Sequence, residues 1–207
     1  MSKPVIRNVV FDFGNVLVDW DPFGALKSLF GDRSYMDERL AEIDFFDWNK
    51  DQDRGRSWEE GFSWVKRHHP NHLEIFEAYH RNIQNAHIEP IEGMAKLVGE
   101  LATNGAQIFG LTNASELAFQ CVRKTCPYVE DFSDILVSAR EGLVKPHPKI
   151  FERLLARNGI EPRETIFVDD SEANCIGASS VGLIAHRFVG AKQLRVDLAL
   201  GGHEPKN

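Results

Sequence analysis

The sequence contains few cysteines, and they form no zinc-binding pattern. Only Cys121, Cys126 and Cys175 occur among 207 residues. Their number is odd, and their spacings match no zinc motif. We therefore expect reduced thiols in a cytoplasmic protein, with neither disulfides nor a zinc site.

Long apolar runs and an excess of basic residues are also missing. No stretch is apolar enough to span a bilayer, and the first residues do not resemble a secretory leader, so we expect no membrane partner. The 24 basic and 31 acidic side chains give a formal net charge of −7. This balance excludes nucleic-acid binding through a basic face. A phosphorylated ligand would need a metal ion or a few well-placed cations to offset the negative charge.

Short β-branched runs alternate with helical patterns over the second half of the chain. The runs predict strands over 5–11, 106–111, 134–137, 165–168 and 183–188. Apolar residues at helical spacing predict helices over 90–102, 115–124, 148–158 and 171–181. This alternation predicts an α/β fold with a doubly wound parallel sheet.

The pattern differs between the first strand and Pro90. This segment is rich in aromatic residues at helical spacing and contains no convincing strand. We therefore expect a core of residues 1–17 and 88–207, with a helical cap of residues 18–87 inserted after the first strand. An insertion there would lie over the carboxyl edge of the sheet, where it can act as a lid.

Asp12 directly follows the apolar run of the first predicted strand. A carboxylate at the end of a buried strand is costly unless it is paired, bound to a metal or used as a cap. In an open parallel sheet, ligands bind at the carboxyl ends of the strands. Asp12 is therefore either a capping residue or part of a site.

Polar residues also follow other predicted strands. Thr112 and Asn113 follow the second strand, Asp169 and Asp170 follow the fourth, and Lys145 lies in a loop. Each alone could be an ordinary loop, surface or capping residue. Together they would bring a hydroxyl, an amide, an ammonium and carboxylates to one edge of the sheet. Carboxylate oxygens without cysteine or histidine suit Mg²⁺.

Four segments resemble, in order, the motifs of the haloacid dehalogenase (HAD) superfamily, whose members are mostly phosphatases with an aspartate nucleophile. The segments are 11–17, 111–113, 145–148 and 168–174. The resemblance covers the whole chain and implies a Rossmann-like core with a small cap. The continuation at 17–22 is similar to a bacterial subgroup that includes an α-D-glucose-1-phosphate phosphatase.

The resemblance implies a nucleophile and a metal site. Asp12 would attack the phosphorus of a small phosphorylated metabolite, which we expect to be a sugar phosphate, and form an aspartyl-phosphate. Mg²⁺ would be bound by Asp12, by the backbone carbonyl of Gly14 and by the acid pair. Asp170 would be the direct ligand of that pair, and Asp169 would bind through water.

The resemblance also implies a phosphate-binding set. Thr112 and the backbone of Asn113 would donate hydrogen bonds to phosphoryl oxygens. Lys145 would offset the negative charge and keep the nucleophile ionised. Asn174 would orient Lys145 or the acid pair as a supporting residue.

Gly14 is the main departure from the family pattern. Most phosphatases of the superfamily have a second aspartate there, which protonates the leaving group and then activates water. The dehalogenases lack it as well, because a halide leaves without a proton. A metal-free 2-haloacid dehalogenase and a non-catalytic phosphometabolite-binding domain are therefore the alternatives. Asp169 and Asp170 favour the phosphatase, because they would repel Asp12 strongly without a cation.

The expected cap contains charged and aromatic residues of open role. We expect Asp51, Asp53 and Arg54 to be solvated, although any of them could supply the missing proton or contact a sugar. Trp20 or Trp48 could face the substrate, with packing as the usual role of such side chains.

Overall fold

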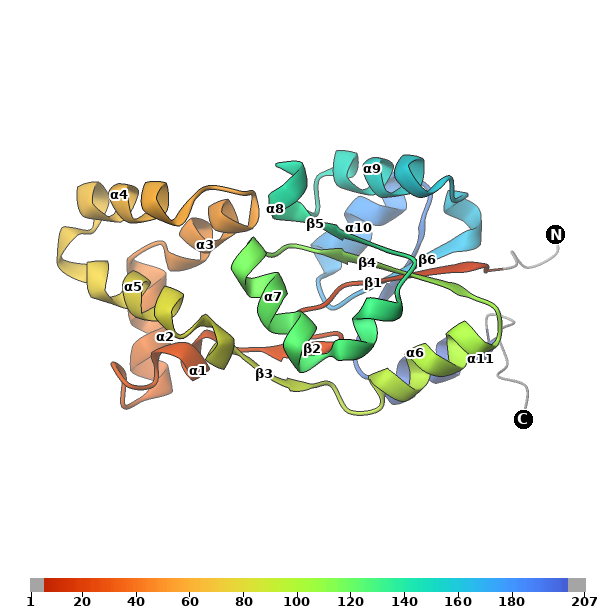
Figure 1. Ribbon diagram of the computed structural model, residues 1–207, viewed down its shortest axis with the longest axis horizontal. Coiled ribbons are helices and arrows are strands. Elements are labelled where there is room, and N and C mark those ends of the chain that lie inside the picture. Colours follow the sequence, from red (N-terminus) through yellow and green to blue (C-terminus); the bar gives the residue numbers. More distant parts are fainter. Residues whose placement is uncertain (1–5, 201–207) are drawn as a thin grey trace.

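The computed structural model describes residues 6–200 (Figure 1). Its central sheet has five parallel strands in the order β5-β4-β1-β6-β7. The strands are β1 (Asn8–Phe11), β4 (Gln107–Thr112), β5 (Asp134–Val137), β6 (Thr165–Asp169) and β7 (Ile184–Arg187). The predicted α/β fold with a doubly wound parallel sheet is confirmed. The predicted start of the first strand at Val5 lies outside the described residues.

Helices cover both faces of the sheet, because alternate residues of each strand point to opposite sides. Val10 packs in the cluster that contains residues of α9 and α10, whereas Val9 and Phe11 belong to the cluster with residues of α6 and α11. The first pair of helices is α9 (Pro148–Asn158) and α10 (Glu172–Ser180), and the second is α6 (Met94–Thr103) and α11 (Ala191–Leu200). Two further helices, α7 (Glu116–Thr125) and α8 (Ser138–Glu141), follow β4 and β5.

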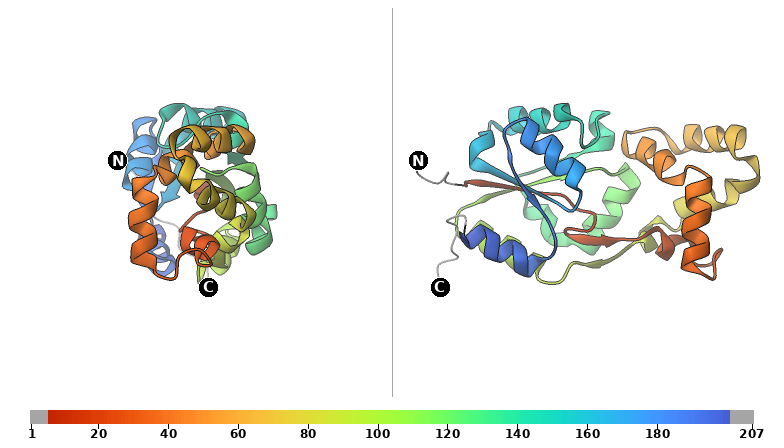
Figure 2. Two further views of the ribbon diagram at one scale, coloured as in Figure 1. Left: turned by 90° about the vertical axis from the view of Figure 1, so that its left-hand side faces the viewer. Right: turned by 180° about the vertical axis from the view of Figure 1, so that it is seen from behind.

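Residues 18–87, which we call the cap, form a helical body at one end of the molecule (Figure 2). Its helices are α1 (Pro22–Leu26), α2 (Arg33–Glu42), α3 (Phe45–Asp53), α4 (Trp58–His68) and α5 (Leu73–Arg81). Buried aromatic rings join α3 to α5, with centroids 4.7 Å apart for Trp48 and Phe76 and 4.9 Å apart for Phe45 and Tyr79. That the cap is a separate domain stays a prediction.

Short elements complete the described chain. The 3₁₀ turns are η1 (Pro70–His72), η2 (Ile83–Ala86), η3 (Pro127–Asp131) and η4 (Pro162–Glu164). The strands β2 (Val18–Trp20) and β3 (His87–Pro90) pair antiparallel where the chain enters and leaves the cap. The prediction of no strand between the first strand and Pro90 is therefore wrong. Strands of three and four residues are too short for an alternating pattern to be visible in the sequence.

The three cysteines are free thiols. Cys121 and Cys126 are buried, and Cys175 is partly exposed. Burial raises the pKa of all three thiols, which keeps them protonated and weakly reactive at neutral pH. Within residues 6–200, no helix combines the length and the apolar character needed to cross a membrane.

Candidate active site

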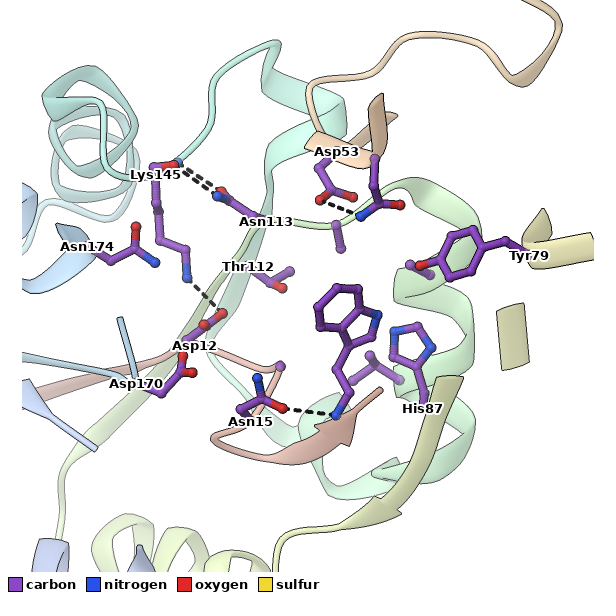
Figure 3. A pocket seen from close by; sticks show the side chains of 16 residues that line it. Asp12, Asn15, Asp53, Tyr79, His87, Thr112, Asn113, Lys145, Asp170 and Asn174 are labelled. Carbon is purple, nitrogen blue, oxygen red and sulfur yellow. Dashed lines mark hydrogen bonds and ion pairs between the residues drawn. The ribbon is translucent and has the colours of Figure 1, made fainter. Parts of the chain in front are cut away.

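A cavity of about 170 Å³ lies between the carboxyl edge of the sheet and the cap (Figure 3). Seven predicted site residues line it, namely Asp12, Gly14, Thr112, Asn113, Lys145, Asp170 and Asn174. Asp169 is fully buried beside them. Trp20 also lines the cavity, whereas Trp48 is buried in the aromatic cluster of the cap.

Asp12 is positioned by β1, the central strand of the sheet. Its backbone N–H donates to the carbonyl of Val168 on β6 at 2.9 Å, which fixes the chain just past the end of β1. Its side-chain Oδ1 accepts from the N–H of Phe13 at 2.7 Å. The residue is 8% exposed, so its carboxylate faces the cavity with little access to bulk water.

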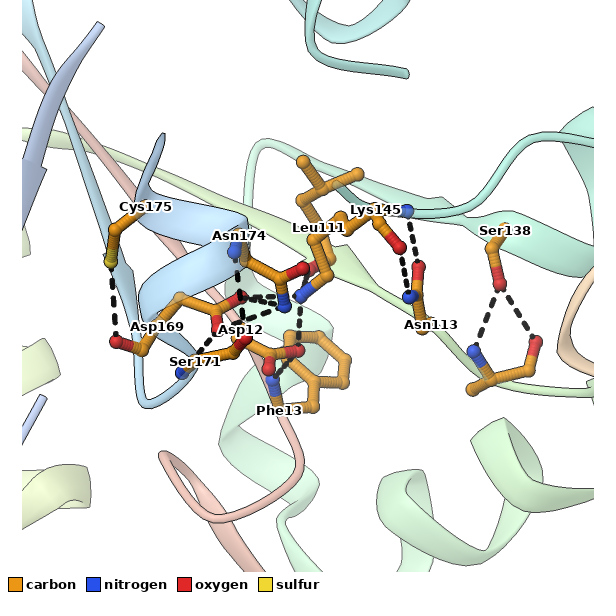
Figure 4. A network of polar contacts seen from close by, with 11 residues as sticks. Asp12, Phe13, Leu111, Asn113, Ser138, Lys145, Asp169, Ser171, Asn174 and Cys175 are labelled. Carbon is orange, nitrogen blue, oxygen red and sulfur yellow. Dashed lines mark hydrogen bonds and ion pairs between the residues drawn. The ribbon is translucent and has the colours of Figure 1, made fainter. Parts of the chain in front are cut away.

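Lys145 is fully buried and joins two carboxylates (Figure 4). Its Nζ lies 2.7 Å from Asp12 Oδ1 and 2.7 Å from Asp169 Oδ2, and it donates to the carbonyl of Leu111 at 2.9 Å. Burial alone lowers the pKa of Lys145, but the two carboxylates outweigh it and the net shift is upward. The ammonium is therefore charged, and all three of its hydrogens have acceptors.

The Asp169 carboxylate accepts hydrogen bonds from several protein donors. Asn174 Nδ2 donates to its two oxygens at 3.0 and 3.1 Å, and the N–H of Ser171 donates to Oδ1 at 2.9 Å. With Lys145, these contacts hold the Asp169 carboxylate in place. Asp170, by contrast, is half-buried and opens onto the cavity.

The acidic residues crowd around one point. Single carboxylate oxygens of Asp12, Asp169 and Asp170 all lie within 4.8 Å of one another. Burial raises the pKa of Asp12, although the charge of Lys145 opposes the shift. The pKa of Asp170 is also raised, first by burial and then by repulsion from Asp169. Three carboxylates and one ammonium carry two net negative charges. A set of hard oxygen donors with this charge fits a divalent cation such as Mg²⁺.

Thr112 and Asn113 come from the end of β4 and the turn that follows it. Thr112 lies between Asp12 and Asp53 in Figure 3. The Asn113 side chain turns toward the backbone of Lys145. Sheet geometry therefore brings the polar residues of β1, β4 and β6 to one place, as the parallel arrangement predicts.

Asp53 differs in its surroundings from Asp51 and Arg54. Asp51 and Arg54 form an exposed ion pair at 2.6 Å, as expected for solvated side chains. Asp53 instead lines the cavity, and its Oδ1 accepts from the N–H of Ser115 at 2.9 Å. Its predicted solvation is wrong, because the loop that follows α3 docks onto the core.

Gly55 allows this docking. Its φ is +102°, and a Cβ built there would lie 2.6 Å from the carbonyl oxygen of Ala139. The hydroxyl of Ser138 donates to the carbonyl of Asp53 and accepts from the N–H of Ala114 at 2.9 Å. Asp53 is half-buried there, and burial of its carboxyl raises its pKa to about 8, although the Ser115 N–H opposes the shift and the charge of Asp12 adds to it.

Three further cavity residues come from or border the cap, namely Asn49, Tyr79 and His87. His87 Nδ1 lies 3.0 Å from the carbonyl of Ile83. A carbonyl only accepts, so Nδ1 carries the proton, and Nε2 of the neutral ring is an acceptor. Burial lowers the pKa of His87, which keeps it neutral. Sequence analysis missed these residues, because they lie in no motif and in aromatic-rich segments typical of packing.

Comparison with known families agrees with this geometry. A family model described as haloacid dehalogenase-like hydrolase matches residues 6–182. The chain belongs to this family. The match includes β1, β4, β5 and β6 together with the cap, so the sheet edge and the cavity both belong to the HAD-like hydrolase unit.

Several curated relatives of this HAD-like hydrolase are named as phosphatases. It is 33% identical over 97 residues to the sesquiterpene phosphatase astK of Aspergillus oryzae, a match that covers 47% of this chain and 50% of the relative. It is 29% identical over 123 residues to a glyceraldehyde 3-phosphate phosphatase of Pyrococcus furiosus, covering 58% of this chain and 50% of the relative. The chain spans about half the length of these relatives.

Solved structures share the fold of this HAD-like hydrolase. A HAD family enzyme from Bacteroides thetaiotaomicron superposes with a TM-score of 0.71 at 23% identity, over 88% of this chain and 93% of that one. The L-2-haloacid dehalogenase of Xanthobacter autotrophicus superposes with a TM-score of 0.64 at 19% identity, over 97% of this chain and 85% of that one. Identities this low establish the fold alone.

Proposed function

We propose that this HAD-like hydrolase is a Mg²⁺-dependent phosphatase that hydrolyses a small phosphate monoester through an aspartyl-phosphate on Asp12. The observation that carries the proposal is the convergence of Asp12, Asp169 and Asp170 around one point beside the charged Lys145. The relatives named as phosphatases support it. The solved structure of the Bacteroides thetaiotaomicron enzyme in complex with magnesium and inorganic phosphate also supports the proposal.

The metal would be held by Asp12, Asp170 and the backbone carbonyl of Gly14. Asp170 is our choice for the direct ligand of the acid pair, because it opens onto the cavity, whereas Asp169 is occupied by protein donors and would bind through water. When bound, the ion would draw charge from a phosphoryl oxygen and offset the repulsion between the substrate and the acidic residues.

The chain's own residues have distinct tasks in this reaction. Asp12 attacks phosphorus, and its bond to phosphorus forms as the bond to the leaving oxygen breaks. Lys145 favours the ionised form of Asp12, which the attack requires. Thr112 and the N–H of Asn113 donate to phosphoryl oxygens, which carry the charge during transfer. Asn174 holds Asp169, and Asp169 in turn holds Lys145.

We propose that the substrate is a small sugar phosphate. We also propose that the enzyme is cytoplasmic and that its thiols are reduced. A cavity of about 170 Å³ is small beside the roughly 300–1,000 Å³ that is typical of ligand pockets. Asn49, Tyr79 and His87 offer amide, hydroxyl and imidazole groups to the hydroxyls of a sugar. The similarity of 17–22 to the subgroup with an α-D-glucose-1-phosphate phosphatase supports the same choice.

The test compares three compounds with and without EDTA, namely p-nitrophenyl phosphate, α-D-glucose 1-phosphate and 2-chloropropionate. We expect phosphate release that EDTA abolishes and that Asp12→Asn eliminates. Halide release that persists in EDTA would instead identify a metal-free dehalogenase. Saturable binding of a phosphate ester without turnover would identify a non-catalytic binding domain.

Metal binding is tested separately by thermal unfolding. A ligand that binds only the folded state stabilises it, so Mg²⁺ should raise the melting temperature. Asp170→Asn should remove this shift. Asp51→Asn is the matched control, because Asp51 is an exposed acid that pairs with Arg54 away from the cavity.

A further inference from the structure

Cleavage of an alkyl phosphate requires a proton for the leaving oxygen. When Asp12 displaces an alkoxide, that strong base must be protonated as the bond to phosphorus breaks. Gly14, two residues after Asp12, has no side chain that could donate this proton. If the proposed function holds, another residue of the cavity must supply this proton.

Most cavity residues cannot supply it. The three hydrogens of Lys145 are directed to Asp12, Asp169 and Leu111. The ring proton of His87 is donated to the carbonyl of Ile83, away from the site. Asp170 belongs to the proposed metal site. Among the described residues of the cavity, Asp53 and Tyr79 are the remaining acids.

We propose that Asp53, supplied by the cap, is the general acid and base of this phosphatase. The inference rests on the proposed function and names the residue that replaces the acid missing at Gly14. Asp53 is the last residue of α3 and is held by the N–H of Ser115 through its Oδ1 and by Ser138 through its carbonyl. Its Oδ2 has only a long contact, 3.4 Å, to Asn49.

The position of Asp53 fits an in-line displacement. Figure 3 shows Asp53 and Asp12 on opposite sides of the cavity, with Thr112 between them. In phosphoryl transfer, the attacking and leaving oxygens lie roughly in line through phosphorus. A leaving group displaced by Asp12 therefore departs toward the cap, where Asp53 lies. Water that later attacks the aspartyl-phosphate approaches from the same side.

The electrostatics of the cavity keep Asp53 protonated when the cap is docked. Burial, followed by the charge of Asp12, raises the pKa of Asp53 to about 8, against the Ser115 N–H and Lys145. The other acid that faces it is Tyr79, whose pKa is raised far above its usual value by burial and then by Asp53. Asp53 is therefore the stronger acid of the two at neutral pH.

Asp53 gives up a proton in the first step of hydrolysis and regains one in the second. Asp12 bonds to phosphorus, the bond to the leaving oxygen breaks, and that oxygen takes the proton of Asp53 and leaves as an alcohol. The Asp53 carboxylate then accepts a proton from water as the water oxygen bonds to phosphorus and the bond to Asp12 breaks. Phosphate is released, and Asp53 is again protonated.

The test uses Asp53→Asn and two classes of substrate that the wild-type protein hydrolyses. The amide keeps the shape of the side chain and still accepts from Ser115. We expect kcat/KM for an alkyl phosphate such as α-D-glucose 1-phosphate to fall by about 10²–10⁴-fold. Single-turnover release of p-nitrophenolate, which leaves without a proton, should be nearly unchanged. Later turnovers should be slow, because water lacks its base.

The pH profile gives a second readout. In the wild-type protein, kcat/KM for the alkyl phosphate should decline as pH rises through about 8, and Asp53→Asn should lose this limb. Asp51→Asn, on the same helix but ion-paired at the surface, should match the wild-type protein in both assays.

Three results would overturn the inference while leaving the phosphatase intact. Equal losses on both substrates would indicate that Asp53 only positions the cap. No loss on either would remove it from the reaction. If Tyr79→Phe, rather than Asp53→Asn, lost activity on the alkyl phosphate but kept p-nitrophenolate release, the proton would be assigned to Tyr79. A wild-type protein without phosphatase activity would instead refute the proposed function itself.

Discussion

Asn113 binds the backbone of Lys145 at both ends of the residue. Its side-chain Oδ1 accepts from the N–H of Lys145 at 2.8 Å, and its Nδ2 donates to the Lys145 carbonyl at 3.0 Å. The end of β4 thereby fixes the loop that carries the buried ammonium. Asn113 thus acts on the site through its side chain as well as through the backbone N–H proposed to bind phosphate.

Asn113→Ala should remove both hydrogen bonds. We expect the free energy of unfolding to fall by about 1–3 kcal/mol, because two polar groups of the Lys145 backbone lose their partners. The value of kcat should fall with it, since Lys145 is no longer held beside Asp12. Urea unfolding and steady-state assays measure the two effects. Asn158→Ala is the matched control, because Asn158 also makes two hydrogen bonds, to Asp134 and Leu154, far from the site. It should lower stability but leave kcat unchanged.

Lys145→Met should be the most damaging substitution at the site. It leaves Asp12 and Asp169 buried without a cation, and breaking a buried pair in this way costs about 3–5 kcal/mol. We expect activity to vanish, because the pKa of Asp12 rises further when its counter-charge is removed. Denaturant unfolding and phosphate release test this. Lys149→Met, on the exposed start of α9, should have neither effect. Wild-type stability in Lys145→Met would contradict the assigned charge network.

Asp53 should make the folded state less stable as pH rises. Its folded pKa is raised to about 8 from an ordinary value of 3.8, so between these values the folded state binds more protons than the unfolded state. Stability therefore falls with increasing pH over that window. Asp53→Asn removes this loss, and we expect the variant to be more stable than the wild-type protein at pH 8 by at least about 1 kcal/mol. Below pH 4 the difference should disappear. Urea unfolding at several pH values tests both expectations.

Two helical glycines should respond oppositely to alanine. A Cβ on Gly177 of α10 would collide with the carbonyl oxygen of Pro146, next to Lys145, whereas Gly99 of α6 has open space around it. Gly99→Ala should stabilise the protein by about 0.5–1 kcal/mol through helix propensity alone. Gly177→Ala should destabilise it and lower kcat, because the Lys145 loop must shift. Thermal melts and assays of the pair check this, and equal stabilisation by both would refute the close packing.

The sheet and the residues at its edge could be predicted from the sequence for one physical reason. Buried parallel strands are continuous apolar runs, and each run here ends in a polar residue, as at Asp12, Thr112 and Asp169. Parallel strands bring such ends together without further information. No comparable rule predicts the structure of the cap from its sequence. The strands β2 and β3 are too short to show a period, and α2 buries only Met36 and Leu40.

The cap side of the cavity could not be predicted from local patterns. Asp53 resembles Asp51 in sequence, and only the docking of the loop onto Ser115 and Ala139 separates an acid that faces the cavity from a solvated one. Tyr79 and His87 belong to segments whose aromatic residues mostly pack. Their place at the cavity depends on contacts between residues distant in the chain, which periodicity does not record.

Two contacts that dock the cap use its main-chain atoms, which separates them from the side chains that line the cavity. The carbonyl of Ala139 meets the backbone at Gly55, and the carbonyl of Asp53 is held by Ser138. These contacts hold the cap over the cavity without using side chains of its wall such as Asn49 and His87. Exchange of Asn49 should therefore change which hydroxyl pattern is accepted, while the main-chain contacts keep the cap over Asp12.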